Sequence, residues 1–238
     1  MLLRLDSVSK TYGALKVVDA ISLSVAEGET LGVLGPNGAG KTTLFNLITG
    51  DTRVDSGSVR FADEDVTHYA PHRRCRLGIG RSYQIPQPFG AMTVFENTLV
   101  AATFGGGLSE REAHPLCVDV LAQSGLLERA NQLAGGLTLL DRKRLELARA
   151  LATQPRLLLL DEIAGGLTEH EARELVEEIR AIRARGVTMI WIEHVVHALL
   201  AVADRLFVIH YGQKLAEGTP QEVVNDEMVK RVYLGIEA

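Results

Sequence analysis

Apolar residues occur along this chain in short runs that alternate with longer stretches of helical period. The short runs have the length of strands buried on both faces, and they fall at residues 30–35, 157–160, 187–192 and 205–210. The clearest helical stretch is 169–185, which has a charged face and is followed by Gly186, a residue that commonly ends helices. Strands that alternate with helices in this way predict an α/β fold with a mostly parallel sheet.

Residues 86–152 show a different pattern. Stretches of helical period follow one another there with no convincing strand between them, at 93–104, 109–125 and 137–153. We therefore predict a helical subdomain over approximately 86–152. It is inserted into a core made of approximately 1–85 and 153–238, all within a single domain, 1–238.

Weaker patterns refine this outline. Residues 15–25 and 58–61 alternate polar and apolar positions, which is typical of an antiparallel layer with one face packed on the core. In the helical region, Ser109 followed by Glu112 predicts a capping box at the start of a helix. Pro115 argues against a long uninterrupted helix at that place.

Composition narrows the class of protein. The chain has 238 residues, of which 46% are hydrophobic and 23% charged, and this suits a globular domain and excludes a disordered chain. The net charge of -5 argues against general affinity for nucleic acid. Apolar runs fall short of the roughly 20 residues of a membrane span, and residues 1–10 lack the pattern of a signal peptide. The spacing of Cys75 and Cys117 fits neither a metal site nor a disulfide framework, so we expect a reducing cytosol.

One segment carries a strong chemical signal. A glycine-rich loop follows the apolar run 30–35 and fits G-x-x-x-x-G-K-[ST] at every fixed position, with the residues Gly35, Pro36, Asn37, Gly38, Ala39, Gly40, Lys41 and Thr42. Glycines let backbone N–H groups turn toward phosphate oxygens, and the helix that follows adds partial positive charge. In such a loop Lys41 reaches the β- and γ-phosphates of ATP, the Thr42 hydroxyl ligates Mg²⁺, and Thr43 completes the nucleotide-binding set. The segment predicts an α/β core of the P-loop NTPase type.

An acidic pair follows the leucine run 157–160. Asp161 stands where a carboxylate holds Mg²⁺ directly or through water, and the adjacent Glu162 is placed to polarise an attacking water. A solvated acidic pair at the end of a strand is the alternative. The phosphate loop upstream favours the catalytic interpretation.

Over essentially its whole length the chain resembles the ATP-binding subunits of ATP-binding-cassette (ABC) transporters. That family has an adenine-stacking aromatic residue near its start, a glutamine between core and helical lobe, and a histidine after the strand that follows the acidic pair. Tyr12, Gln84 and His194 stand at these places. The resemblance implies that Tyr12 stacks on adenine, that Gln84 reaches Mg²⁺ and the attacking water, and that His194 hydrogen-bonds the γ-phosphate. Packing alone is the alternative for Tyr12 and His194.

The family also has a signature loop, commonly Leu-Ser-Gly-Gly-Gln, that caps the ATP bound to the opposite subunit of a head-to-tail dimer. Leu133–Gly136 has a similar composition, but we interpret it as a decoy. Asp141 lies 20 positions before Asp161, which is the family spacing, so we place the loop at Leu137–Asp141. There Thr138 keeps the hydroxyl that the resemblance assigns to nucleotide binding.

Substitutions in this loop predict an impaired composite site. Leu139 and Leu140 replace two glycines and hinder close backbone approach, and Asp141 replaces a glutamine and brings negative charge toward the phosphates. Ile163 and Thr168 also depart from the family pattern, on the face turned toward the partner. We therefore expect low ATPase activity from the isolated chain and pairing with a different ATPase that has an intact signature.

Within the family, residues 81–97 and the ending Tyr233–Gly235 resemble the ATPases of branched-chain amino-acid importers. Residues 229–235 also resemble the ending of the lipopolysaccharide-export ATPase, which is the rival interpretation. We interpret the basic cluster His72–Arg76 as a solvated helix face and not as a contact with nucleotide or lipid.

The resemblance implies an ATPase subunit that powers solute transport across the inner or plasma membrane, first of all import of branched-chain amino acids or a similar small polar solute. It implies ATP and Mg²⁺ as cofactors. The implied partners are membrane permease subunits, a second ABC ATPase in a homo- or heterodimer, with the heterodimer favoured, and indirectly a periplasmic solute-binding protein. No nucleic acid is expected. Such a subunit is cytoplasmic and peripheral on the cytoplasmic face of the membrane.

Other classes stay open. A soluble ABC ATPase without a transport role would share the nucleotide motifs, although such proteins often have two fused cassettes, a coiled insertion or more cysteines. A small-molecule kinase would share only the phosphate loop and would not need Gln84, Asp161, Glu162 and His194 in this order. Membrane fractionation separates these classes, because a transporter subunit sediments with its permease.

Overall fold

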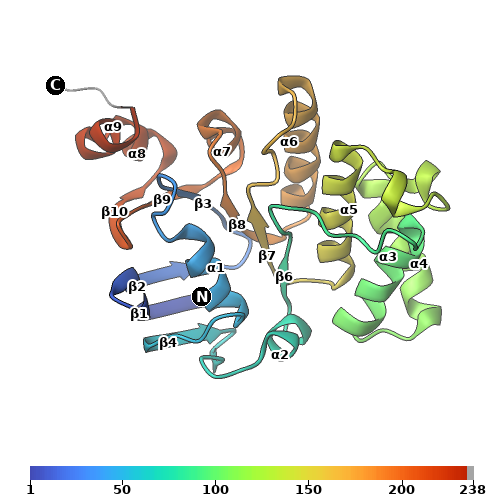
Figure 1. The fold of residues 1–238 in the computed structure, drawn as a ribbon, viewed down its shortest axis with the longest axis horizontal. Coiled ribbons are helices and arrows are strands. Elements are labelled where there is room, and N and C mark those ends of the chain that lie inside the picture. The colour runs from blue at the N-terminus through green and yellow to red at the C-terminus, as the bar shows by residue number, and fades with distance from the viewer. Residues whose placement is uncertain (235–238) are drawn as a thin grey trace. The chain divides into compact units, whose positions relative to one another are not determined.

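The computed structural model describes residues 1–234 of the chain (Figure 1). They form two compact units, one with residues 1–71 and the described residues from 188 onward, the other with residues 72–187. Each unit contains strands and helices, so the α/β class is confirmed. The limits 86–152 of the helical subdomain stay a prediction. Gly235, the last residue of the family-like ending, lies outside the described residues.

The first unit contains strands in the order β10-β9-β3-β8. Their bounds are Thr30–Leu34 for β3, Thr188–Ile192 for β8, Arg205–His210 for β9 and Gln213–Gly218 for β10. Strand β3 pairs in parallel with both β8 and β9, whereas β10 pairs antiparallel with β9. Every residue of β3 and β8 is buried, as expected for continuous apolar strands covered on both faces. The predicted strands of this unit are confirmed.

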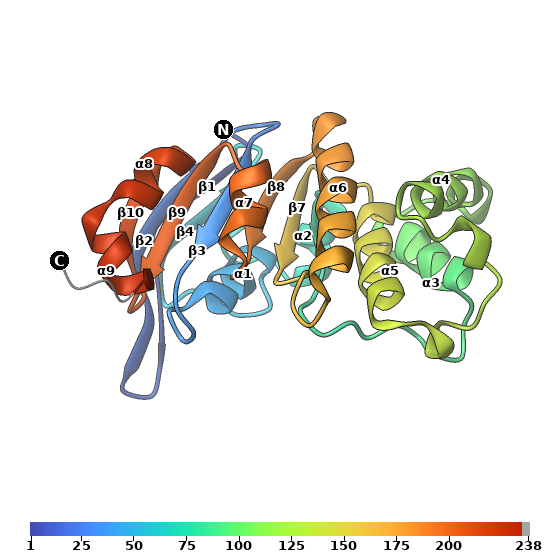
Figure 2. The same ribbon diagram turned by 90° about the horizontal axis from the view of Figure 1, so that it is seen from above.

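A second sheet of the same unit is antiparallel, in the order β2-β1-β4-β5. Its strands are β1 (Leu3–Tyr12), β2 (Leu15–Val25), β4 (Ser56–Phe61) and β5 (Glu64–Asp65). The predicted antiparallel layer is thus confirmed; in Figure 2 its strands β1 and β2 are dark blue and β4 is cyan. The helices of this unit are α1 (Lys41–Thr49), α7 (Val196–Val202), α8 (Pro220–Asn225) and α9 (Glu227–Leu234).

The second unit pairs β6 (Ile79–Arg81) in parallel with β7 (Leu157–Asp161). The chain between these two strands is described throughout. Apart from loops and turns, its secondary structure is helical, with a single β-bridge between Thr93 and Leu133. The helices of this unit are α2 (Pro71–Arg76), which begins at the unit boundary, α3 (Val94–Val100), α4 (Glu110–Gln123), α5 (Leu139–Ala152) and α6 (Glu169–Ala184). A π-helical turn η1 (Ala101–Gly105) and the 3₁₀ turns η2 (Leu127–Arg129) and η3 (Ala134–Gly136) connect them.

Small side chains let these helices pack closely. Ala102, Ala113, Cys117 and Ala152 are fully buried together, and larger side chains such as Phe95 pack around them. Burial raises the pKa of the Cys117 thiol to about 11. This cysteine therefore acts as a small apolar side chain of the lobe core.

Helix α4 begins as predicted and then departs from the prediction. Glu112 accepts hydrogen bonds from the backbone N–H of Ser109 at 3.0 Å and from its hydroxyl at 2.6 Å, which confirms the capping box. The helix nevertheless runs through Pro115, so the expectation of an interruption is wrong. Pro115 removes only the bond to the carbonyl of Arg111, and because both residues are exposed, water can satisfy that carbonyl. The apolar face through Ala113 and Cys117 packs without disturbance.

No helix within residues 1–234 combines the length and the apolar character needed to cross a membrane.

Candidate functional site

The phosphate loop connects β3 to α1 in the first unit. Close contacts explain two of its glycines: a Cβ on Gly35 would lie 2.5 Å from the carbonyl oxygen of Ile209, and a Cβ on Gly40 would lie 2.4 Å from that of Val17. Gly40 also has a φ of 104°, a left-handed conformation that residues with a Cβ rarely adopt. The loop backbone therefore packs directly on the main chain of β9 and β2, and a side chain at either position would displace it.

Lys41 is enclosed by this loop. The residue is 5% exposed, and its Nζ donates to the carbonyl oxygen of Gly35 at 2.7 Å and of Pro36 at 3.1 Å. Thr42, the next residue, is exposed. Gly40 stands at the N-cap of α1 and offers no side chain to cap it, so the helix start presents backbone N–H groups to an anion.

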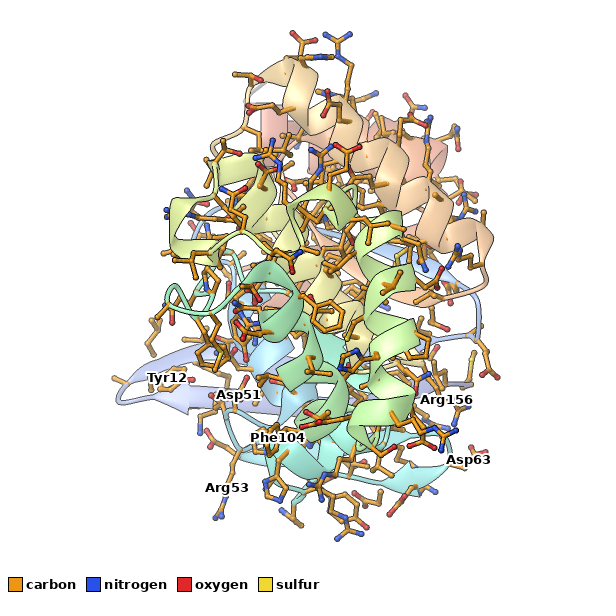
Figure 3. The ribbon with its side chains drawn as sticks, turned by 90° about the vertical axis from the view of Figure 1, so that its right-hand side faces the viewer. Tyr12, Asp51, Arg53, Asp63, Phe104 and Arg156 are labelled. Atoms are coloured by element: carbon orange, nitrogen blue, oxygen red, sulfur yellow. The ribbon has the colours of Figure 1, made fainter. Side chains whose placement is uncertain are left out.

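Tyr12 and His194 lie at other edges of the same unit. Tyr12 ends β1 at the hairpin with β2 (Figure 3), is 48% exposed, and has the Nζ of Lys10 at 5.5 Å from its ring centroid. His194 follows β8 and is exposed, and its backbone N–H donates to the Glu193 carboxylate at 2.9 Å. A half-exposed aromatic face and an exposed imidazole suit ligand contact better than core packing.

In the second unit Asp161 ends β7 beside an arginine that the sequence analysis did not assign. The Nη2 of Arg81 lies 2.7 Å from Oδ2 of Asp161, and the side chains are 6% and 3% exposed. Arg81 ends β6, which is paired in parallel with β7, so both side chains emerge at the same edge of the strand pair. This buried ion pair fixes the direction of the Asp161 carboxylate.

Gln84 and Glu162 lie side by side. Nε2 of Gln84 donates to Oε2 of Glu162 at 2.6 Å. The Nζ of Lys143 lies 3.3 Å from the carbonyl oxygen of Gln84 and 3.4 Å from that of Glu162. Lys143 was also missed by the sequence analysis. Its position could have indicated it. Lys143 lies three residues after Leu140 and four before Leu147, so this charged residue falls on the apolar face of α5.

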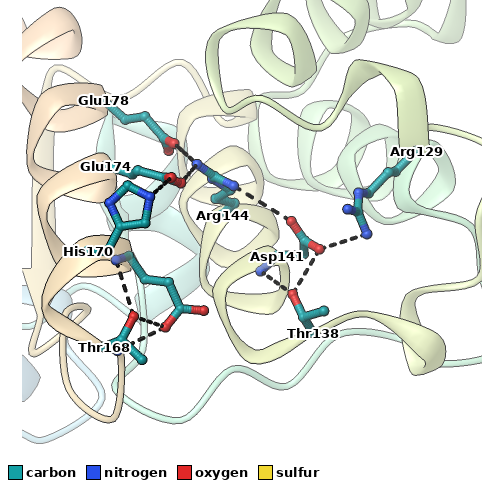
Figure 4. Close-up of polar contacts among 9 residues, drawn as sticks. Arg129, Thr138, Asp141, Arg144, Thr168, His170, Glu174 and Glu178 are labelled. Carbon is teal, nitrogen blue, oxygen red and sulfur yellow. Dashed lines mark hydrogen bonds and ion pairs between the residues drawn. The ribbon is translucent and has the colours of Figure 1, made fainter.

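Thr138 and Asp141 lie at the start of α5, where their side chains engage each other (Figure 4). The Thr138 hydroxyl donates to Oδ2 of Asp141 at 2.8 Å and accepts from its backbone N–H at 3.3 Å. Asp141 is 4% exposed and forms ion pairs with Arg129 at 2.8 Å and Arg144 at 3.8 Å. The expectation that Asp141 directs negative charge toward bound phosphates is therefore wrong, because its carboxylate is buried in the lobe and bonded to Thr138 and Arg129. Arg144 is shared with Glu174 and Glu178, which lie closer to it.

The two leucines of this loop differ from each other. Leu139 is 45% exposed at the first position of α5, and Leu140 is buried. Leu133–Gly136, the similar segment upstream, contains the 3₁₀ turn η3, and the N–H of Gly135 donates to the carbonyl of Gly90 at 3.0 Å. A Cβ on Gly135 would lie 3.0 Å from the same oxygen, so local packing explains this glycine.

The basic cluster His72–Arg76 forms most of α2. His72, Arg73 and Arg76 are exposed, as expected of a solvated face, but Arg74 is 2% exposed. The interpretation is wrong for Arg74, whose guanidinium lies inside the protein. A six-residue helix has too few turns for its sequence to show which basic side chain faces inward.

Comparison with known proteins agrees with these features. Residues 18–165 match the family model described as ABC transporter. Over 98% of both chains, this chain is 37% identical to the high-affinity branched-chain amino acid transport ATP-binding protein LivG of Salmonella typhimurium. It is also 39% identical to the lipopolysaccharide export system ATP-binding protein LptB of Acidithiobacillus ferridurans, over 98% of this chain and 97% of that protein. A crystal structure of a nucleotide-free ATP-binding cassette from an ABC transporter covers 100% of this chain, with a TM-score of 0.89 and 31% identity.

The strand–loop–helix unit around Lys41 and the acidic pair after a buried strand define a P-loop nucleotide-binding protein. The similarities extend over the whole chain and narrow this class further. The chain belongs to the ABC transporter family and is an ATP-binding subunit that hydrolyses ATP.

Proposed function

We propose that the chain powers the import of branched-chain amino acids or a similar small polar solute across the inner or plasma membrane. The match of residues 213–238 to the family model described as branched-chain amino acid ATP-binding cassette transporter carries this proposal. The LivG relative supports the same substrate class. Lipopolysaccharide export is the second candidate, because the LptB relative is similar over as much of the chain.

In this proposal the chain is a peripheral subunit on the cytoplasmic face of the membrane. It binds membrane permease subunits and a second ABC ATPase, and no nucleic acid. A periplasmic solute-binding protein delivers the solute without touching this chain. The second ATPase is a different protein, because Leu139, half-exposed at the start of α5, obstructs the signature loop of this one. Residues 86–152 form the helical subdomain of the cassette.

The first unit supplies the groups that bind ATP. The backbone N–H groups of Gly35, of Asn37–Gly40 and of the α1 start surround the phosphates. Lys41 exchanges its two carbonyl contacts for the β- and γ-phosphates, a short movement because its Nζ already lies inside the loop. The half-exposed ring of Tyr12 stacks on adenine, and Thr43 lies in the first turn of α1 beside the phosphates.

The oxygen donors of the chain fit Mg²⁺. Thr42 offers an exposed hydroxyl, Gln84 an amide oxygen, and Asp161 a carboxylate held by Arg81. Hydroxyl, amide and carboxylate oxygens are the hard ligands that Mg²⁺ takes together with substrate phosphates. When bound, Mg²⁺ neutralises negative charge on the β- and γ-phosphates.

Hydrolysis needs an oriented water and a group that takes its proton. Glu162 accepts the proton, and the hydrogen bond from Gln84 orients its carboxylate. His194 donates to the γ-phosphate. The hydrogen bond from Gln84 also limits the freedom of the Glu162 carboxylate to turn away.

Replacement of Lys41 and Glu162 tests the site. Lys41→Ala removes the cation that meets the phosphates, so we expect weaker nucleotide binding and a fall in hydrolysis of several orders of magnitude. Glu162→Gln keeps the shape but removes the base, so hydrolysis should be lost while ATP binding is kept and ATP-bound dimers accumulate. Nucleotide titration and single-turnover hydrolysis measure both effects. Normal turnover in either variant contradicts the assignment of that residue.

The substrate is tested with the permease subunits that copurify with this chain. In proteoliposomes that contain ATP inside, we expect accumulation of leucine or a similar solute that depends on Glu162. ATP-driven extraction of lipopolysaccharide from the same vesicles, without solute accumulation, would instead favour the second candidate.

A further inference from the structure

Lys143 places a buried charge beside two residues of the proposed hydrolytic site. It lies on α5 and is 4% exposed. Burial of an ammonium group is costly unless its protons are hydrogen-bonded. Two of the acceptors are the carbonyl oxygens of Gln84 and Glu162, at 3.3 Å and 3.4 Å from Nζ. The lysine thus connects one helix to two segments that lie 59 and 19 positions away in the chain.

The backbone at Glu162 needs such a contact. Glu162 has a φ of 46°, and a residue with a side chain keeps this left-handed conformation only when its surroundings hold it there. Its carbonyl oxygen accepts from Lys143 and also from the N–H of Gly165 at 3.1 Å. These two donors hold the orientation of the peptide group that follows Glu162, and with it the main-chain position from which the side chain extends.

Gln84 is held in the same way. Its side chain donates to Glu162 at 2.6 Å, and its own carbonyl accepts from Lys143. Gln84, Glu162 and Lys143 therefore form a closed triangle in which the lysine holds both main chains and the glutamine holds the carboxylate. Loss of the lysine would release both main chains while leaving the two side chains chemically intact.

We propose that Lys143 is a positioning residue for ATP hydrolysis, whose ammonium group holds the main chains of Gln84 and Glu162 in the arrangement that orients the Glu162 carboxylate. This inference rests on the proposed role of Glu162 as the base. Lys143 contacts main-chain oxygens of these residues and acts through them.

The test compares variants of the full chain in single-turnover hydrolysis with protein in excess over ATP. Lys143→Met keeps the length and removes the charge and its hydrogen bonds, and we expect a fall in the rate of hydrolysis of at least tenfold with ATP affinity within about twofold of the original. Lys143→Arg, which keeps the charge and the donors, should recover most of the rate. If Lys143→Met does not fold, Lys143→Gln replaces it; glutamine is shorter and has a neutral amide as its donor. We again expect a slower rate of hydrolysis with little change in ATP affinity.

Arg149→Met is the matched control. Arg149 lies on the same helix and its Nη1 donates to the carbonyl of Gln87 at 3.1 Å, so it also joins α5 to the segment that contains Gln84. It does not contact Glu162 through any hydrogen bond found among the described residues. Its rate of hydrolysis should stay within about twofold of the original.

The decisive measurement is the Lys143 substitution in the Glu162→Gln background. A positioning role predicts no further loss of the residual rate there, since the group being positioned is gone. An equal fold-loss in both backgrounds overturns the inference, as does a parallel loss of ATP affinity in Lys143→Met. An active Glu162→Gln variant would instead refute the proposed function. If Glu162→Gln is inactive and Lys143→Met is fully active, only the role of Lys143 is refuted.

Discussion

At the scale of single residues, the phosphate loop depends on contacts that differ from one glycine to the next. Gly38 and Gly40 both have positive φ, at 78° and 104°. A Cβ on Gly38 would meet no atom within 4 Å, whereas a Cβ on Gly40 would lie 2.4 Å from the carbonyl oxygen of Val17. An alanine at Gly38 would therefore cost only the free energy of the left-handed backbone, whereas an alanine at Gly40 would also have to displace the neighbouring main chain.

We predict that Gly38→Ala lowers the free energy of unfolding by about 1–2 kcal/mol, the usual cost of a left-handed alanine. Gly40→Ala should cost more and should also abolish nucleotide binding, because the loop must move away from β2. Urea denaturation and nucleotide titration of the two variants measure these effects. Equal losses of stability would show that the contact with Val17 has no consequence.

At the scale of elements, capping boxes start several helices of this chain. In α3, α4, α6 and α8 a Thr or Ser at the N-cap exchanges hydrogen bonds with a glutamate three residues later. In α6 the glutamate is Glu171, and hydrogen bonds from the hydroxyl and then the backbone N–H of Thr168 lower its pKa below the ordinary 4.5. Such a group stabilises the fold above its ordinary pKa, and this contribution is lost as the pH falls through the folded-state value.

We predict that Glu171→Gln is less stable than the original chain at pH 7 and that the difference shrinks as the pH falls below about 4.5. Gln can take the same cap position but has no charge, so it resembles the protonated glutamic acid. Urea midpoints measured across this pH range test the prediction. Glu169→Gln, which alters a neighbouring carboxylate outside the capping box, is the control. A difference that is independent of pH would contradict the electrostatic explanation.

The pKa of Glu178 is shifted in the opposite direction from that of Glu171. Desolvation raises its pKa, although hydrogen bonds and charge from Arg144 act against this. Its contribution to stability is present below its ordinary pKa and lost as the pH rises through the folded-state value. The change in stability with pH therefore includes opposite contributions from Glu171 and Glu178. The Glu171→Gln variant removes the contribution of Glu171 alone.

At the scale of the whole molecule, the proposal that the chain pairs with a different ATPase rests on the altered signature at Leu137–Asp141. Leu139→Gly is the substitution that tests the signature most directly, because Leu139 is 45% exposed and its removal leaves no cavity in the core. Leu140 is buried, and Asp141 is paired with Arg129 and Arg144, so changing either would also disturb the lobe.

We predict that Leu139→Gly raises ATP turnover of the isolated chain severalfold, because a glycine there permits closer approach of another copy's nucleotide. Leu133→Gly, which changes a leucine that is 55% exposed and lies outside the proposed signature, should leave turnover unchanged. Turnover should also rise when the heterologous ATPase and the permease are added. If the isolated chain already hydrolyses ATP as fast as the complete transporter, the impaired-signature hypothesis is wrong.

Features that depend on neighbouring residues were predictable from the chain alone. The phosphate loop takes its chemistry from a few consecutive residues between an apolar run and a helix, and the capping box of α4 lies within Ser109–Glu112. The apolar runs at 157–160 and 205–210 became buried strands. In each case backbone preference and burial act over short segments, so the pattern of residue types suffices.

Contacts between distant residues were decided by the tertiary structure. Arg81 reaches Asp161 across 80 positions, and Lys143 reaches Gln84 across 59. The inward direction of Arg74 and the burial of the Asp141 carboxylate beside Arg129 likewise depend on what each side chain meets after packing. A long charged side chain has the same local preferences whether it ends in water or against another segment. Only the packed fold selects between these environments, and with them the residues that hold the site in place.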